Sequence, residues 1–333
     1  MALPAEMTVI EMNGFGPAEV MREAKRPVPK PVAGEVLIKV AAAGINRVDV
    51  LQRSGQYRPP YGVWDVPGVE LAGEIVAMGP GTGRFKVGDP VCALVIGGAY
   101  AEYCTVPEAQ VLRLPKGYDM VRAAALPETL FTVWAGVMWQ GRYKGGESLL
   151  VHGGSSGIGT TTIALARALG NGTIYATAGS DAKCRAVEKL GVKRCINYRT
   201  EDFVAVVNAL AGERAIDVIL DMVIGPYVPR NQSLLADDGR LVFIGLMSGQ
   251  REVTINGSWV MMRRHTVTGV SLRGQSVERK DALRRDMEAV VWPLLDRGEM
   301  PPVIDTVYPL RDAVKAHKFL ETSEHIGKLV LTL

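Results

Sequence analysis

The stretch that decides the fold is VHGGSSGIG, at residues 151–159, in which four glycines and two serines follow an apolar start. The run ESLLVH before it is typical of a strand, and the run GTTTIALARAL after it is typical of a helix. Glycine removes side chains, so backbone N–H groups can approach a ligand, and a helix that starts after such a loop favours a phosphate. The stretch therefore predicts a phosphate-binding turn between a strand and a helix.

Strand-like and helix-like patterns alternate after this turn. The expected strands are TIYATAG (173–179), RCINY (194–198), AIDVILDMV (215–223) and RLVFIGLM (240–247). The expected helices between them are DAKCRAVEKLG, EDFVAVVNALAG and most of VPRNQSLLADDG. This alternation predicts βαβ crossovers and a doubly wound parallel sheet, so the fold class is α/β.

The segments on either side of this region have a different texture. The first third is rich in Gly and Pro, and its expected strands are EVLIKVAAAG (35–44), VELAGEIVAMG (69–79) and DPVCALVI (89–96). They predict a compact β-rich domain. A helical stretch begins near Ala123, and the tail holds helical runs before a final strand, KLVLTL, which we expect to rejoin the first domain.

Composition excludes several classes of protein. Hydrophobic residues make up 47% of the 333 residues and charged residues 22%, which is typical of globular domains. The net charge of +3 without a basic block argues against nucleic acid as the main partner. There is no signal-peptide pattern, no apolar run of membrane-spanning length and no CxxC pair among the four cysteines. These features predict a soluble, cytoplasmic protein.

The glycine loop has the spacing GxxGxG, formed by Gly154, Gly157 and Gly159. It lies where a dinucleotide pyrophosphate would bind, at the strand-to-helix turn that opens the βαβ array. The spacing differs from the common GxGxxG, so the prediction depends on this context. The alternative is a glycine-rich turn that binds no ligand.

The end of the second expected strand bears on the choice between NAD and NADP. An NAD site expects an acidic residue about 20 positions after the glycines, and this chain has Gly179 and Ser180 there, followed by Lys183, with Tyr198 after the next strand. A small residue, a hydroxyl and a cation suit a 2′-phosphate, so we expect NADPH. Asp181 is discordant, and we expect it to cap the next helix. The alternative for Lys183 is a solvated helix face.

Two oxidoreductase families have a similar loop. GGSSGIG resembles the short-chain dehydrogenases, but that family begins with the loop and needs a Tyr-x-x-x-Lys pair, which this sequence lacks. The whole chain instead resembles the medium-chain dehydrogenase/reductase superfamily, through GEVLIKVAAAGINRVD, PGVELAGEIVAMG, FKVGDPV and IGKLVLTL. Within it, the sequence is most similar to the zeta-crystallin-like quinone oxidoreductases. RSGQYRPP, LPETLFTVW, INYRTEDF and DGRLVFIGLMSG resemble the tumour-suppressor-inducible subgroup.

This resemblance implies a domain organisation. A GroES-like catalytic domain would span residues 1–124 and be completed by 272–333. A Rossmann NADP-binding domain would span 125–271. The family commonly dimerises, and RLVFIGLM at a sheet edge would extend the sheet into a second copy.

The resemblance also implies a reaction without metal. Zinc alcohol dehydrogenases have Cys and His at positions where this chain has Asn46 and Val69, and neither residue can replace those zinc ligands. The four histidines match no ligand spacing. Without a Lewis acid, an acceptor that is already electrophilic is favoured, such as a quinone or an enone. We therefore predict an NADPH-dependent quinone oxidoreductase. The alternatives are an enone or enoyl-thioester reductase and an NADPH-binding structural or RNA-binding protein.

The site residues follow from the same resemblance. Asn46, Tyr57 and Thr132 would be catalytic, with Tyr57 as a candidate proton donor. Alternatively, Asn46 is an ordinary loop asparagine, Tyr57 packs on the Pro59–Pro60 loop, and Thr132 fills the core. The predicted cofactor-binding residues are Asn46, Thr132, Gly154, Ser156, Gly157, Ile158, Gly179, Ser180, Lys183, Tyr198, Phe243, Leu246, Met247, Ser271, Arg273 and Lys328.

Overall fold

The computed structural model describes residues 3–57 and 65–333, and the chain divides into two compact units. Unit 1 comprises Met1–Phe131 with Leu272–Leu333, and unit 2 is Thr132–Ser271. The sequence predicted the first division at 124/125, whereas α3 (Pro127–Val133) runs across the point where the structure divides. Prediction and structure place the second division after residue 271.

Unit 2 is built on a six-stranded parallel sheet with the strand order β10-β9-β8-β11-β12-β13. The strands are β8 (Leu149–Val151), β9 (Ile174–Ala178), β10 (Arg194–Asn197), β11 (Ile216–Asp221), β12 (Leu235–Phe243) and β13 (Thr266–Gly269). The chain runs outward from β8 to β10 and then returns to β11, which confirms the predicted doubly wound sheet. The strand order thus reverses between β8 and β11, where ligands bind in open α/β sheets.

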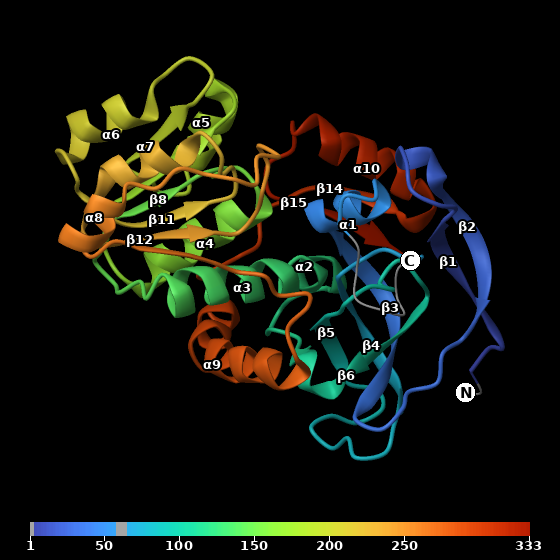
Figure 1. Cartoon of the computed structure of the whole chain (residues 1–333). Coiled ribbons are helices and arrows are strands. Elements are labelled where there is room, and N and C mark those ends of the chain that lie inside the picture. Colours follow the sequence, from blue (N-terminus) through green and yellow to red (C-terminus); the bar gives the residue numbers. More distant parts are fainter. Residues whose placement is uncertain (1–2, 58–64) are drawn as a thin grey trace. The chain divides into compact units, whose positions relative to one another are not determined.

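Helices cover this sheet, and most of them begin at side-chain caps. They are α4 (Gly157–Leu169), α5 (Asp181–Glu188), α6 (Phe203–Ala211), α7 (Tyr227–Leu234), α8 (Gly257–Met262) and the π-helical segment η3 (Trp134–Gln140). Figure 1 shows α6 and α7 side by side along the sheet, where Phe203 and Val228 pack against Leu150 and Ile219. Burial of these apolar faces holds the helices on the sheet.

One prediction for unit 2 is wrong. RLVFIGLM does not form a sheet edge, because Arg240–Phe243 belongs to β12, which pairs with β11 on one side and β13 on the other. The edge strand on this side of the sheet is β13, and β10 forms the other edge. The short sequence TVTG of β13 lacks the apolar run that marks the inner strands. The helix expected over most of VPRNQSLLADDG is α7, which ends at Leu234, because the next residues begin β12.

Unit 1 contains a seven-stranded sheet and a two-stranded one. The larger has the order β14-β15-β3-β4-β5-β7, and β6 also pairs with β3; the smaller pairs β1 with β2. The strands are β1 (Glu6–Met12), β2 (Met21–Pro27), β3 (Glu35–Ile45), β4 (Glu70–Met78), β5 (Pro90–Leu94), β6 (Tyr103–Pro107), β7 (Val111–Arg113), β14 (Ile304–Pro309) and β15 (Lys328–Thr332). β15 pairs antiparallel with β3, which confirms that the final strand rejoins the first domain.

Unit 1 also contains helices, and some of them pack on its sheets. They are α1 (Arg47–Arg53), α2 (Met120–Ala124), α9 (Val277–Asp296) and α10 (Ala313–Thr322), with 3-10 turns at Ala18–Val20, Glu108–Gln110 and Leu310–Asp312. Leu320 of α10 and Val50 of α1 join a core that includes Ile38, Leu71 and Leu331. In residues 3–57 and 65–333, no helix has both the length and the apolar character that crossing a membrane requires.

Candidate functional site

The glycine loop of unit 2 connects β8 to α4 and is closed by a serine cap. Ser156 is the N-cap of α4, where its Oγ accepts a hydrogen bond from the Gly159 N–H at 3.0 Å and donates one to the Gly153 carbonyl at 2.8 Å. Gly157 and Ile158 form the first turn of α4. Because α4 has 13 residues and its first N–H groups have no intrahelical partners, its N-terminus suits an anion.

The loop packs so tightly that glycine is required. A Cβ on Gly159 would lie 2.3 Å from the Gly153 carbonyl oxygen, and one on Gly154 would lie 2.7 Å from the Ala176 Cβ. Gly153 has a φ of +71°, a conformation that favours glycine. The loop therefore lies flat against β8 and β9 and presents backbone rather than side chains. This cradle fits the pyrophosphate of a dinucleotide.

The predicted 2′-phosphate residues lie together at the end of β9. A Cβ on Gly179 would be 2.7 Å from the Tyr198 hydroxyl and 3.6 Å from the Arg199 Nε. Ser180 caps α5 and accepts from the Lys183 N–H at 3.3 Å. Arg199 is a cation that the sequence prediction missed, because it lies two strands away from the glycine loop along the chain.

The role predicted for Asp181 is wrong. The cap of α5 is Ser180, and Asp181 is the first residue of the helix. The Asp181 Oδ1 accepts a hydrogen bond from the Asn197 Nδ2 at 2.7 Å. The Asp181 side chain therefore points to β10. Its negative charge in the first turn of α5 interacts favourably with the helix dipole.

The other predicted residues of unit 2 lie in different settings. Phe243 does not follow β12 but is its last residue, opposite Asp221 of β11, where it packs against the core. Leu246 and Met247 do follow it and are 41% and 50% exposed. Ser271 is exposed at the end of the unit, and Thr132 is buried in α3. Their contacts with a cofactor stay predictions.

Unit 1 holds a buried polar cluster around Asn46. Its Nδ2 donates to the Glu70 Oε1 at 2.8 Å, and its Oδ1 accepts from the Lys328 Nζ at 2.5 Å. The Lys328 Nζ also donates to the Glu70 Oε1 at 2.6 Å and to the Ile45 carbonyl at 3.0 Å, so all three of its N–H groups are used. A Cβ on Gly44 would collide with Glu70 at 2.1 Å. The cluster therefore joins β3, β4 and β15 and fixes the amide of Asn46.

This geometry gives Lys328 a role that differs from the predicted one. The sequence prediction assigned Lys328 to the cofactor. In the structure, the residue is 4% exposed and its ammonium group forms hydrogen bonds within unit 1. A direct contact with the cofactor stays a prediction. What the structure describes is a lysine that positions Asn46.

Asp49 lies at the centre of a second buried group and forms a capping box with Asn46. It accepts from the Asn46 N–H at 2.8 Å, from the Gly68 N–H at 3.2 Å and from the Tyr100 hydroxyl at 3.2 Å. The Tyr100 hydroxyl also contacts the His317 Nε2 at 3.0 Å. Loss of hydration raises the pKa of Asp49 from 3.8 to about 6, and the hydrogen bond from Asn46 opposes this. Burial lowers the pKa of His317 to about 3.

A pH dependence of stability follows from the raised pKa of Asp49. Between a pH of about 4 and about 6, the Asp49 carboxyl keeps its proton in the folded protein and has lost it in the unfolded chain. The contribution of Asp49 to the free energy of unfolding therefore falls as the pH rises. We expect the stability of the wild type relative to Asp49→Asn to decrease from about pH 4.5 to about pH 7. Urea unfolding of both proteins measures this difference in the free energy of unfolding. A difference that does not change with pH would contradict the prediction.

Arg273 lies against Tyr57 with one donor unused. Its Nε donates to the Ile96 carbonyl at 2.7 Å and its Nη2 to the Gln52 Oε1 at 2.6 Å. The guanidinium carbon lies 5.6 Å from the centre of the Tyr57 ring. The Nη1 is buried and has no hydrogen-bond partner. A buried donor without a partner costs about 1–3 kcal/mol, so the group is suited to an oxygen from a ligand. The alternative packing of Tyr57 on Pro59–Pro60 lies outside the described residues.

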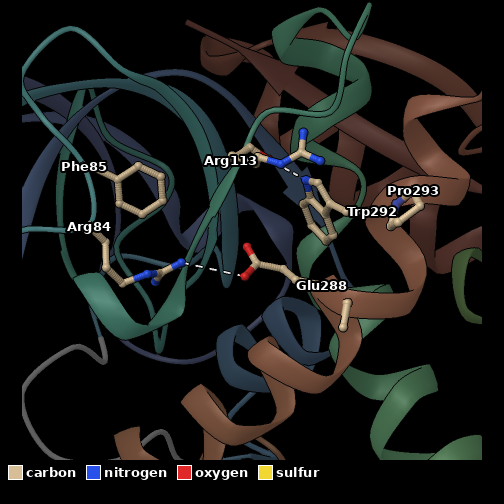
Figure 2. A pocket seen from close by; sticks show the side chains of 7 residues that line it. Arg84, Phe85, Arg113, Glu288, Trp292 and Pro293 are labelled. Atoms are coloured by element: carbon tan, nitrogen blue, oxygen red, sulfur yellow. Dashed lines mark hydrogen bonds and ion pairs between the residues drawn. The ribbon is translucent and has the colours of Figure 1, made fainter.

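A surface hollow of about 460 Å³ in unit 1 contains none of the predicted site residues. Figure 2 shows Arg84, Arg113, Glu288 and Trp292 in its lining. Arg84 lies 3.7 Å from the Glu288 carboxylate, Arg113 binds Asp296 at 2.6 Å, and the Trp292 Nε1 donates to the Arg113 carbonyl. Its charged groups satisfy one another, so the hollow is not a candidate site.

Two family models match the chain. The alcohol dehydrogenase GroES-like domain matches residues 32–116, and the zinc-binding dehydrogenase model matches residues 157–289. The quinone oxidoreductase of Rattus norvegicus is 32% identical over 330 residues, which cover 98% of each chain. The chain belongs to the medium-chain dehydrogenase/reductase superfamily.

Solved structures of other proteins share this fold. The human synaptic vesicle membrane protein VAT-1 homolog-like protein is 26% identical, with a TM-score of 0.87 and coverage of 99% of each chain. The CurK enoyl reductase is 25% identical, with a TM-score of 0.85 and 99% coverage of each chain. The predicted GroES-like and Rossmann architecture is confirmed. As a member of this superfamily, the protein is an oxidoreductase that uses a nicotinamide cofactor.

Asn46 and Val69 occupy the positions at which zinc alcohol dehydrogenases have metal ligands. Asn46 holds Glu70 and Lys328, and Val69 is buried and apolar. Within the described part of the chain, no group of three or more His, Cys, Asp or Glu residues is arranged to hold a metal ion. The reaction without metal stays a prediction and is part of the proposal below.

Sequence reasoning missed several polar residues of these clusters. They are Asp49, Gln52, Glu70 and Arg199. Only Asp49 had a local signal, because an acid three residues after an asparagine fits a capping box. The others come together through strand order, which no spacing in the sequence reveals.

Proposed function

We propose that this protein is an NADPH-dependent quinone oxidoreductase that transfers a hydride to its acceptor without a metal ion. The observation that carries the proposal is the buried Arg273, whose Nη1 lacks a partner beside the Tyr57 ring. Within the described residues, Arg273 forms no ion pair with a carboxylate, so its charge is available to a ligand. Reduction of a quinone produces an anionic oxygen, which a desolvated guanidinium stabilises strongly.

The preference for NADPH is supported by the end of β9. The strand ends at Ala178 and is followed by Gly179 and Ser180, where an NAD site would have an acid. Arg199 and Tyr198 lie against Gly179, and Lys183 lies in the first turn of α5. Cations and hydroxyl groups favour a phosphate, whereas a carboxylate would repel it.

The chemistry assigns a distinct task to each part of the chain. NADPH, when bound, supplies the hydride. The glycine loop and the N-terminus of α4 bind and orient its pyrophosphate. Arg273 holds the developing oxygen charge, and Tyr57 can give a proton to that oxygen. Asn46 is kept in one orientation by Glu70 and Lys328. Its Nδ2 also makes a long contact of 3.5 Å with the Gly44 carbonyl, which the cofactor or the acceptor would replace.

An enoyl-thioester reductase is the second candidate, favoured by the likeness to the CurK enoyl reductase. Initial rates of NADPH and NADH oxidation with an ortho-quinone, a para-quinone and an enoyl thioester compare the two. We expect turnover with quinones and NADPH. In Tyr57→Phe, quinone turnover should persist, because a reduced quinone oxygen needs no obligatory donor. Reduction of a thioester should fall about a hundredfold or more.

The outcomes separate the parts of this proposal. Turnover with the thioester alone would replace the substrate class but leave the cofactor. A preference for NADH would contradict the proposal that Gly179, Lys183 and Arg199 form a site for the 2′-phosphate. Loss of quinone turnover in Tyr57→Phe would count against quinone as the acceptor.

The partners and location form part of the same proposal. The partner is a small quinone or enone, with no nucleic acid or membrane expected. A second copy of the chain would pair through β13, because that strand, and not β12, lies at this edge of the sheet. A cytoplasmic location is supported by four free cysteines, all of them buried.

A further inference from the structure

A chain of buried polar groups runs beneath the glycine loop of unit 2. His152, the residue after β8, is 0% exposed. Its Nδ1 lies 3.0 Å from the Thr177 Oγ1 in β9, and its Nε2 lies 2.7 Å from the Asn231 Oδ1 in α7. The Asn231 Nδ2 donates to the Asp221 Oδ2 at 2.9 Å, at the end of β11. Four side chains from four elements are thus linked in series.

The Asp221 carboxylate at one end of this chain of groups determines the direction of each hydrogen bond. A carboxylate oxygen only accepts, so Asn231 turns its NH2 to Asp221 and its carbonyl oxygen to His152. The His152 Nε2 must then carry the proton, which leaves Nδ1 to accept from the Thr177 hydroxyl. Each polar group therefore requires its neighbour in one orientation.

The Asp221 end of the chain holds a strained turn. The Asp221 Oδ1 accepts from the Val223 N–H at 2.7 Å and from the Ile224 N–H at 3.0 Å. Ile224 has a φ of +61°, which is rare for a β-branched residue. Strain of this kind persists only where the surroundings impose it, and it is concentrated at functional sites.

This turn lies between the two predicted contact segments for the cofactor. A Cβ on Gly153 would lie 2.4 Å from the Met222 sulfur, so the turn packs directly on the glycine loop. On its other side, the Met222 carbonyl accepts from the Met247 N–H at 2.9 Å, and the Val223 carbonyl accepts from the Ser248 N–H at 3.0 Å. The turn and the glycine loop follow β11 and β8, the strands at which the sheet order reverses.

The Thr177 end reaches the glycine loop itself. The Thr177 Oγ1 lies 3.4 Å from the Gly153 nitrogen, and the Thr177 carbonyl accepts from the Gly154 N–H at 2.8 Å. The hydroxyl therefore joins His152 to the start of the loop. Both ends of the chain act on backbone that a dinucleotide would touch.

The surroundings keep His152 neutral. Loss of hydration lowers its pKa, and Arg230 lowers it further, while Asp221 and the hydrogen bond with Asn231 oppose this. The rings of Phe203 and Tyr227 lie edge-on at 4.9 and 4.8 Å. A neutral ring can accept at Nδ1 and donate at Nε2, as the chain requires.

We propose that Thr177, His152, Asn231 and Asp221 form a positioning relay that sets the affinity of unit 2 for the dinucleotide. It holds the glycine loop and the turn at residues 222–225 in register, so that the pyrophosphate cradle and the segment at 246–248 fit one ligand together. The relay rests on the proposed binding of a nicotinamide dinucleotide at this loop, and it adds residues that touch no cofactor atom.

The test uses substitutions that remove a hydrogen-bonding group of the relay with almost no change in volume. Thr177→Val removes the hydroxyl, and Asn231→Asp replaces the donor to Asp221 by an oxygen. Dissociation constants for NADPH and NADH are measured on the ligand-free protein by quenching of its fluorescence, with thermal unfolding in parallel. We expect each variant to weaken both dinucleotides about tenfold or more, because a buried polar group loses its partner. The ratio of the two affinities should not change.

A matched control and a double variant separate positioning from general destabilisation. Thr177→Ser keeps the hydroxyl and should restore most of the affinity. In the double variant, the loss should be close to that of either single variant, because both break the same relay. In the steady state, KM for the dinucleotide should rise more than kcat falls.

Two results would overturn the relay. One is unchanged dissociation constants in Thr177→Val and Asn231→Asp, even with lower melting temperatures. The other is an equal loss in Thr177→Ser and Thr177→Val, which would mean that retaining the hydroxyl does not preserve the affinity. If the wild type binds neither dinucleotide, the proposed function fails and the relay fails with it.

Discussion

Lys328→Met lowers the free energy of unfolding by about 3–5 kcal/mol, because it leaves the carboxylate of Glu70 buried without its counterion. Glu70 is 0% exposed and Lys328 is 4% exposed, and the Nζ and the carboxylate oxygen are 2.6 Å apart. Methionine has nearly the same length, so the volume is kept and the charge is removed. The midpoint of urea unfolding measures the effect.

Two comparisons show whether this loss comes from the buried charge. Lys315→Met removes an exposed lysine that pairs with Asp312 at 2.9 Å, and we expect a change of at most about 1 kcal/mol. Adding Glu70→Met to Lys328→Met removes both charges and should recover much of the loss. A loss below about 1 kcal/mol in Lys328→Met alone would contradict the importance of the pair.

Gly159→Ala weakens dinucleotide binding by about 1–3 kcal/mol, or roughly five- to a hundredfold, because the added methyl group overpacks the loop. Its Cβ would lie 2.3 Å from the Gly153 carbonyl oxygen and 2.6 Å from the Gly154 Cα. Both neighbours are backbone atoms, so they can move only if the cradle moves. The dissociation constant for NADPH, measured by fluorescence, checks the prediction.

Gly257→Ala is the matched control for this substitution. Gly257 is the first residue of α8, as Gly159 lies in the first turn of α4, and a Cβ at Gly257 meets nothing within 4 Å. We expect affinity and stability to stay at the level of the wild type. An equal effect of the two alanines would mean that crowding in the glycine loop does not govern binding.

The fold was largely predictable because its signals are local. The apolar runs of β8, β9 and β11 and the periodic patterns of α4 to α6 set the doubly wound sheet, and the predicted bounds differ little from the observed ones. β13 escaped prediction because TVTG is short and only half-buried. An edge strand needs no continuous apolar run, since only part of it faces a core.

The candidate site was only partly predictable. The loop with Gly154, Ser156 and Gly159 is held by hydrogen bonds between residues that are close along the chain, so its conformation can be predicted from the local sequence. Tyr198 and Gly179 also lie together as predicted, because adjacent parallel strands end at the same edge of the sheet. Asp181 was misread, because a sequence cannot say which of two neighbouring polar residues caps a helix.

By itself, the sequence determined the two-part organisation, the parallel sheet and the glycine loop, because backbone preferences and periodic burial act over short stretches of chain. Only the tertiary structure decided that Lys328 holds Asn46 and Glu70 and that His152 connects Thr177 to Asn231. Those partners lie far apart along the chain, and their pairing depends on strand order and register. Once such groups are buried, each must find a partner, and which partner it finds is a property of the packed fold.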